Sequence, residues 1–125
     1  MNLPENHQSI IPYLILENTS EFIDFTQKVF GAEKGSREIL RENKTVMHGE
    51  IIINGNTIMI SDVNNDWRKQ TAHLFVYVPN AEQTYRKALE WGSKNVMDIA
   101  TKNFLTSCGV LDPFGNVWWI TSILE

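Results

Sequence analysis

Two short runs of β-favouring residues each come shortly before a stretch whose apolar residues recur at helical spacing. The first run is Tyr13–Leu16 and the second covers residues 75–78. Runs rich in aromatic and branched residues are typical of strands, whereas apolar residues three and four positions apart are typical of a helix with one buried face. The order of a strand followed by a helix is therefore expected twice along the chain.

The two helical stretches have matching ends. The segments Asn18-Thr19-Ser20 and Pro79-Asn80 stand at their starts, where a side-chain oxygen can accept a hydrogen bond from a free backbone N–H group. Gly31 and Gly92 stand at their ends, because glycine readily adopts the left-handed conformation that closes a helix. The residues expected to face the core are Phe22, Thr26, Val29 and Phe30 in the first helix, and Ala81, Tyr85, Ala88 and Leu89 in the second.

An internal repeat extends this pattern. Gly49 aligns with Gly109 and Gly55 with Gly115, so the offset is 60 residues in both cases, and each copy reads as strand, Gly-Asn turn and strand. A further strand is expected at residues 35–40 and at residues 94–99. The sequence thus predicts an α+β fold of two tandem βαβββ modules, at about residues 9–62 and 71–123, joined by a polar linker at about residues 62–70.

Composition limits the number of domains and the kinds of partner. A chain of 125 residues with 42% apolar residues can bury one core but not two independent ones, so residues 1–125 are expected to form a single domain. The net charge is −4, and Glu38 and Glu42 interrupt the basic residues between positions 34 and 44. This pattern disfavours a nucleic-acid groove and is typical of a strand with one face in solvent.

Cysteine content and hydropathy indicate the cellular compartment in which the protein is expected. The single cysteine, Cys108, cannot form an internal disulfide, and residues 1–8 are polar without the apolar run of a signal peptide. No apolar stretch approaches the roughly 20 residues that a membrane span needs. We therefore expect a cytoplasmic protein that binds neither nucleic acid nor a membrane.

Several short motifs resemble the PhnB-like branch of the vicinal-oxygen-chelate superfamily, which includes glyoxalase I, extradiol dioxygenases and bleomycin-resistance proteins. They lie at residues 11–14, 30–33, 46–50, 60–62 and 112–118, and the last of these, Asp-Pro-Phe-Gly-Asn-Val-Trp, is the strongest match. The resemblance covers nearly the whole chain. It departs at Phe104-Leu105-Thr106, where relatives usually carry a Gly-Asp-Arg-type stretch, so no role of that arginine carries over.

The resemblance implies that both modules form a curved mixed sheet around a cup, with the helices on the outer face. In metal-using members, four ligands come from the first and last strands of each module, and these positions fall on Ile11, Met59, His73 and Trp119. Only His73 is an ordinary ligand for a divalent ion in this set. The sequence therefore predicts no bound metal and no other cofactor.

The same analogy places aromatic, thioether and polar side chains on the face of the strands that lines the cup. Such walls are typical of pockets for small ligands, although the same side chains could instead fill the cup as core. The ligand-binding candidates are Tyr13, His48, Glu50, Met59, Trp67, His73, Phe75, Tyr77, Cys108 and Trp119.

His48 and Glu50 are two residues apart on one predicted strand and so share a face, whereas Met47 and Gly49 occupy the opposite face, toward the helix. A carboxylate beside an imidazole in the cup could support acid–base chemistry. A solvated polar face or an ion pair is the more ordinary interpretation, as a packed core histidine is for His73. These three residues are the candidates for catalysis, and no catalytic role is assigned.

Three other features have simpler explanations. Trp67, in the linker, could be a lid over the cup or an anchor at an interface. Cys108 aligns with His48 and could face the cup, but it has no predicted cationic neighbour to lower its pKa, which favours a small buried thiol over a nucleophile. Asp112 and Asn116 flank a proline and a glycine, and turn chemistry accounts for both.

The leading functional interpretation is metal-independent small-molecule binding, similar to the bleomycin-resistance type. One alternative is a divalent-metal-dependent lyase, isomerase or dioxygenase of the glyoxalase kind that uses His73, His48 and Glu50 as a relocated ligand set. Another is a structural or protein-interaction module. We also expect a homodimer, because sheets of this superfamily are commonly completed against a partner and because four tryptophans exceed what so small a core easily buries.

Overall fold

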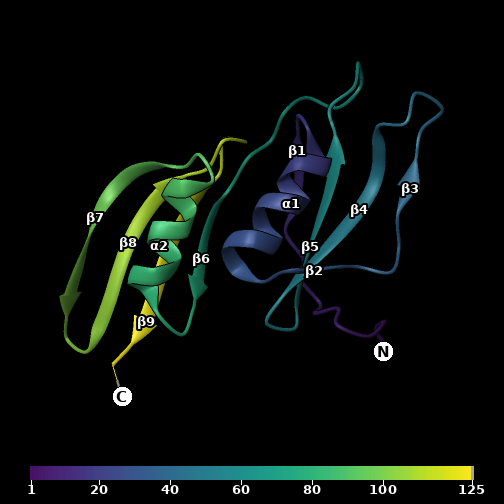
Figure 1. The fold of residues 1–125 in the computed structure, drawn as a ribbon. Coiled ribbons are helices and arrows are strands. Elements are labelled where there is room, and N and C mark those ends of the chain that lie inside the picture. The colour runs from purple at the N-terminus through teal and green to yellow at the C-terminus, as the bar shows by residue number, and fades with distance from the viewer. Residues whose placement is uncertain (125) are drawn as a thin grey trace. The chain divides into compact units, whose positions relative to one another are not determined.

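In a computed structural model, which describes residues 1–124, the chain forms two compact units that divide between Thr71 and Ala72 (Figure 1). Each unit has one helix packed on a β-sheet that contains parallel and antiparallel pairs. This confirms the predicted α+β fold of two tandem modules. A single domain built from both modules, and a cup that they enclose together, stay predictions.

The first unit contains β1 (Tyr13–Leu16), α1 (Thr19–Phe30), β2 (Glu33–Lys34), β3 (Ile39–Leu40), β4 (Val46–Ile53) and β5 (Asn56–Asp62). The order in the sheet is β1-β5-β4-β2, with β3 also paired to β4, and only the β1–β5 pair is parallel. The single strand predicted at residues 35–40 is wrong, because two short strands replace it. Between them, Gly35 donates a backbone hydrogen bond of 2.7 Å to the carbonyl of Glu50.

The second unit contains β6 (His73–Tyr77), α2 (Ala81–Glu90), β7 (Lys94–Lys102), β8 (Leu105–Leu111) and β9 (Val117–Ile123). The order in the sheet is β6-β9-β8-β7, and only the β6–β9 pair is parallel. The strand predicted at residues 94–99 is present as the longer β7. Between β8 and β9, Asp112 accepts hydrogen bonds from the backbone of Phe114 and Asn116 and from the indole of Trp118, which confirms its role in the turn.

The two helices begin differently. Asn80 accepts a hydrogen bond from the backbone of Gln83 at 3.0 Å, as predicted. Asn18 has a left-handed backbone and no side-chain cap, so the predicted cap is wrong there. Asp62, at the end of β5, takes its place and accepts from the backbone of Thr19 at 3.0 Å. Within residues 1–124, neither helix is long and apolar enough to cross a membrane.

The core of each unit lies between its helix and one face of its sheet. Of the residues predicted to face the core, Phe22, Thr26 and Val29 in α1 and Ala81 and Ala88 in α2 are buried. Phe30 and Tyr85 are half-buried, and Leu89 is 37% exposed, so its predicted core position is wrong.

The two hairpins differ in register by one residue. Gly49 of β4 pairs with Ile60, whereas Cys108 of β8 pairs with Ile120, so Cys108 and not Gly109 is the structural counterpart of Gly49. The cause is the turn, because two residues separate β4 from β5 and five separate β8 from β9. A shift of one residue turns a side chain to the opposite face of a sheet.

Candidate functional site

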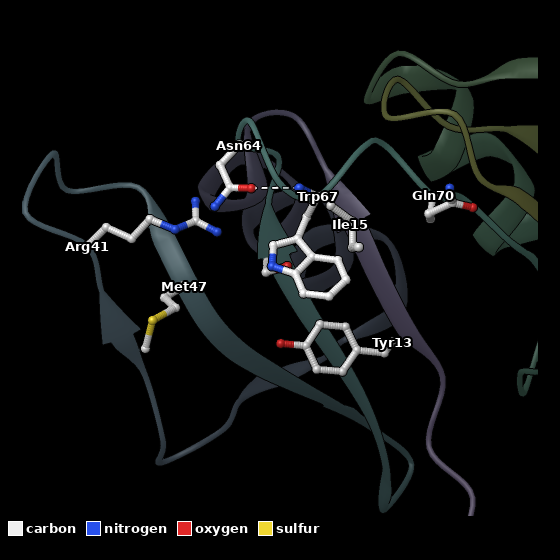
Figure 2. Close-up of a pocket in the computed structure, with 8 residues that line it drawn as sticks. Tyr13, Ile15, Arg41, Met47, Asn64, Trp67 and Gln70 are labelled. Carbon is white, nitrogen blue, oxygen red and sulfur yellow. Dashed lines mark hydrogen bonds between the residues drawn. The ribbon is translucent and has the colours of Figure 1, made fainter.

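A cavity of about 580 Å³ lies within the first unit, on the face of the sheet that carries Tyr13 and Ile15 (Figure 2). Leu14 and Leu16 point the other way, into the core, because side chains alternate along β1. The volume is in the range typical of small-molecule sites. The lining residues are Tyr13, Ile15, Arg41, Met47, Ser61, Asn64, Trp67 and Gln70.

Trp67 is placed by the segment that follows β5. The side-chain oxygen of Asn64 accepts hydrogen bonds from the backbone N–H of Asp66 at 2.9 Å and of Trp67 at 2.7 Å. Gln70 then exchanges two backbone hydrogen bonds with Ile15, of 2.8 Å and 3.0 Å, which hold the segment against β1. Trp67 is 60% exposed, and Figure 2 shows its indole among the lining residues beside the sheet.

Met47 reaches the cavity because of a β-bulge. Leu40 pairs with Val46 and Ile39 pairs with His48, so Met47 is an extra residue opposite the β3 strand. A bulge breaks the alternation of side chains. Val46 is buried in the core, and Met47 lines the cavity instead. The prediction that Met47 faces the helix is therefore wrong.

A row of hydrogen bonds leads away from Tyr13. The Tyr13 hydroxyl lies 3.2 Å from Nδ1 of His48, and Nε2 of His48 lies 2.7 Å from Oε2 of Glu50. The other carboxylate oxygen, Oε1, lies 2.7 Å from Nε2 of His7. The predicted pairing of His48 with Glu50 on one face of the strand is present, and His7 is an additional partner.

His7 belongs to an N-terminal segment that lies against the sheet. The side chain of Gln8 exchanges hydrogen bonds with the backbone of Thr57, at 2.9 Å and 3.2 Å, and the Thr57 hydroxyl donates to the carbonyl of Asn6 at 2.6 Å. These bonds bring His7 to Glu50. Nothing in the polar sequence of this segment indicated that it would cover Glu50.

Burial and hydrogen bonding act on Glu50 in opposite directions. Its side chain is 6% exposed, and this burial by itself raises its pKa, but hydrogen bonds from His48 and His7 outweigh burial and bring the pKa below the ordinary value of 4.5. An ionised carboxylate only accepts hydrogen bonds, so both histidines donate through Nε2. When His48 is neutral, its Nδ1 is then an acceptor, and the Tyr13 hydroxyl donates to it.

The sequence matches no protein-family model and no curated protein. Similar solved structures do exist. Protein PA1353 from Pseudomonas aeruginosa has a TM-score of 0.76 at 18% identity, over 94% of this chain and 99% of that one. The PhnB protein from Bacillus cereus has a TM-score of 0.69 at 20% identity, over 92% and 99%.

A third structure is described as a member of the glyoxalase/bleomycin resistance protein/dioxygenase superfamily, from Sphaerobacter thermophilus. It has a TM-score of 0.63 at 13% identity, over 92% of this chain and 98% of that one. This chain has the vicinal-oxygen-chelate fold. The likeness extends over nearly the full length of each relative, and it supports the α+β fold of two tandem modules that the sequence predicted.

The metal positions that this fold implies do not suit a metal here. The side chain of Ile11 has no atom that could coordinate a metal ion, and that of Met59 offers only a soft thioether sulfur. In the second unit, Nδ1 of His73 accepts a hydrogen bond of 3.2 Å from the indole N–H of Trp119. The indole nitrogen is a donor only and has no lone pair for a cation. Among residues 1–124, no three His, Cys, Asp or Glu side chains are grouped so that they could hold a metal ion.

Four of the ligand-binding candidates lie on one face of the second sheet. The rings of His73 and Trp119 stack with centroids 6.1 Å apart, and those of Phe75 and Tyr77 meet edge to face at 5.2 Å. Phe75 is 60% and Tyr77 55% exposed. These residues form an aromatic surface on the second unit, which we call the β6–β9 aromatic face.

Cys108 does not line a binding surface, so its place among the ligand-binding candidates was wrong. It is fully buried on the helix side of β8, and its thiol donates a weak hydrogen bond to the carbonyl of Ile120 at 3.8 Å. Burial raises its pKa to about 11. The physical reason is the register difference between the hairpins, which gives Cys108 the core position of Gly49 and gives Ser107 the position of His48.

The predicted candidates are thus divided between several places. Tyr13 and Trp67 line the cavity, and His48 and Glu50 form the adjoining hydrogen-bonded row. Met59, paired with Tyr13 across β1 and β5, is half-buried. The cavity residues that sequence reasoning missed are Ile15, Arg41, Met47, Ser61, Asn64 and Gln70. Alternation from Tyr13 along β1 could have indicated Ile15, and alternation from Met59 along β5 could have indicated Ser61, which pairs with Ile15. The other four depend on loops and a bulge.

Proposed function

We propose that the protein binds a small organic molecule in the cavity of the first unit, without a metal ion. The cavity itself is the observation that carries the proposal. It combines two aromatic rings, an aliphatic side chain and a thioether with a few polar groups, which is the usual composition of small-ligand sites.

The chemistry of the fold's metal positions supports the metal-independent part of the proposal. Ile11 and Met59 cannot give a divalent ion the oxygen or imidazole ligands that it prefers. One structural relative carries a superfamily name that includes both resistance proteins and dioxygenases. The fold therefore does not choose between binding and catalysis, and the side chains of the site must do so.

A thermal-shift screen of a small-molecule library, run with a chelator present, tests this proposal. A ligand at a hundredfold excess over its dissociation constant should stabilise the protein by about 2.7 kcal/mol. The Trp67→Ala variant should lose the shift, whereas Trp91→Ala, which removes a comparably exposed indole from the second unit, should keep it. Shifts that need added divalent metal, or that survive Trp67→Ala, would contradict the proposal.

A second candidate function is assembly or protein interaction through the β6–β9 aromatic face. Large exposed apolar patches often mark such surfaces, and aromatic residues are enriched at interfaces. Under this candidate the predicted homodimer would bury Phe75 and Tyr77. Light scattering of the wild type and of a Phe75→Ser variant tests it: a dimer that the variant dissociates supports it, and a monomeric wild type refutes the homodimer.

A further inference from the structure

We propose that the cavity of the first unit selects a planar organic anion, whose charged group binds Arg41 and whose flat apolar body lies against Trp67 and Tyr13. This inference rests on the proposed binding function and adds the chemical class of the ligand. Its starting point is charge, because Arg41 is the only charged residue among the eight that line the cavity.

The guanidinium of Arg41 is held in place by neutral acceptors. One terminal nitrogen donates to the hydroxyl of Thr45 at 3.1 Å, and the other donates to the backbone carbonyl of Asp62 at 2.9 Å. The hairpin that carries Arg41 is fixed by backbone bonds of 2.9 Å between Arg41 and Thr45 and between Lys44 and Arg41. A guanidinium has five N–H groups, so these two bonds leave three for a ligand.

No carboxylate in the described chain forms an ion pair with this guanidinium. The ion pairs within residues 1–124 involve other residues, and Arg41 is in none of them. The nearby carboxylate of Asp62 accepts instead from the backbone N–H groups of Thr19 and Val46. A half-buried cation that forms no ion pair is a favourable partner for an anion, and charge-assisted hydrogen bonds are the stronger kind.

The remaining walls indicate the shape of the ligand. The rings of Trp67 and Tyr13, with Ile15 and Met47, give flat apolar surface, and Figure 2 shows the guanidinium of Arg41 directed toward the side of the cavity where Asn64 lies. Aromatic rings favour stacking with flat partners. The planar guanidinium of an arginine matches the geometry of a carboxylate better than the ammonium of a lysine does. An aromatic carboxylate combines both features.

Isothermal titration with three naphthalene probes tests the inference. The probes are 2-naphthoate, the neutral 2-naphthamide and the cationic 2-naphthylmethylammonium, which share one ring system and differ in charge. Naphthoate should bind roughly 10- to 100-fold more tightly than the amide, as expected for charge-assisted hydrogen bonds. The cation should bind most weakly. Arg41→Gln should remove the preference for the anion and leave amide binding unchanged.

Two further variants keep the test decisive. Arg37→Gln removes an exposed arginine that does not line this cavity and should leave all three affinities unchanged. Arg41→Lys should retain part of the preference and serves if Arg41→Gln does not fold. Amide binding as tight as naphthoate binding, or a preference unchanged in Arg41→Gln, would refute the anion class while leaving the proposed function standing. If library compounds bind but none of the three probes does, the anion class is also refuted. If no library compound binds at all, the proposed function is refuted.

Discussion

Among single residues, Glu50 has the most constrained surroundings in the first unit. Both of its oxygens accept hydrogen bonds of 2.7 Å from histidines, and its side chain is almost fully buried. Glutamine has the same shape but offers only one acceptor oxygen, and its amide N–H groups would face a donor. We expect Glu50→Gln to lower the free energy of unfolding by about 1–3 kcal/mol at neutral pH, measured by urea denaturation.

The pH dependence of stability gives a second test at Glu50. Because its pKa in the folded protein is lower than 4.5, its stabilising contribution is complete above pH 4.5 and is lost as the pH falls through that lowered value. The difference in stability between wild type and Glu50→Gln should therefore shrink in acid. Glu33→Gln, an exposed change in β2, is the control. A difference that stays constant with pH would contradict the assignment.

The thiol of Cys108 should be unreactive toward thiol reagents in the native protein. Its thiol is fully buried, and its pKa is raised from 9.0 to about 11, so little thiolate exists at mildly alkaline pH. A disulfide reagent that forms a coloured product should label the unfolded protein with one thiol per chain and the native protein only as fast as it unfolds. Rapid native labelling would show that Cys108 is accessible, contrary to the register described for β8.

At the scale of elements, the difference in register between the two hairpins has a direct test. A Cβ added at Gly109 would stand 2.6 Å from the ring of Trp119, whereas one added at Gly49 would stand 3.3 Å from Ile60 and Val46. Gly109→Ala should therefore displace the Trp119 ring and cost about 1–3 kcal/mol of stability through overpacking. The indole resonance of Trp119 should shift in Gly109→Ala and stay in place in Gly49→Ala. A Trp119 resonance that stays in place in Gly109→Ala would contradict this register and support the original alignment of the two glycines.

Local patterns predicted most elements but not the irregularities between them. Alternation and helical spacing were enough for the two helices, for β1 and for the long hairpins, because each depends on residues close in sequence. The bulge at Met47 and the unequal turns depend on tertiary pairing. The alignment of identical glycines at a constant offset did not reveal them. The misplacement of Cys108 followed from that alignment alone.

The candidate site was harder to predict for the same reason. Tyr13, Trp67, His48 and Glu50 were found because strand faces and aromatic composition indicated them. His7 was missed because only long-range hydrogen bonds bring it to Glu50. Arg41 was assigned to a solvated strand, and its inward direction follows from bonds to Thr45 and Asp62 that no local pattern predicts.

At the scale of the whole molecule, the cavity and the β6–β9 aromatic face belong to different units. Every residue that lines the cavity lies between Tyr13 and Gln70, within the first unit. The second unit carries the β6–β9 aromatic face. The two surfaces can therefore be altered independently: Phe75→Ser should leave ligand affinity unchanged, and Trp67→Ala should leave the oligomeric state unchanged. Titration and light scattering on the same two variants check this, and a variant that changed both properties would show that the surfaces are coupled.

The most direct measurement is NMR mapping of a library hit or of 2-naphthoate onto the protein in the presence of a chelator. The resonances of Tyr13, Met47 and the Trp67 indole should shift in a saturable way, with the same dissociation constant for all three. The resonances of the Trp91 and Trp118 indoles should stay in place. Shifts confined to residues outside the cavity, or shifts that appear only after a divalent metal is added, would contradict metal-independent binding in the first unit.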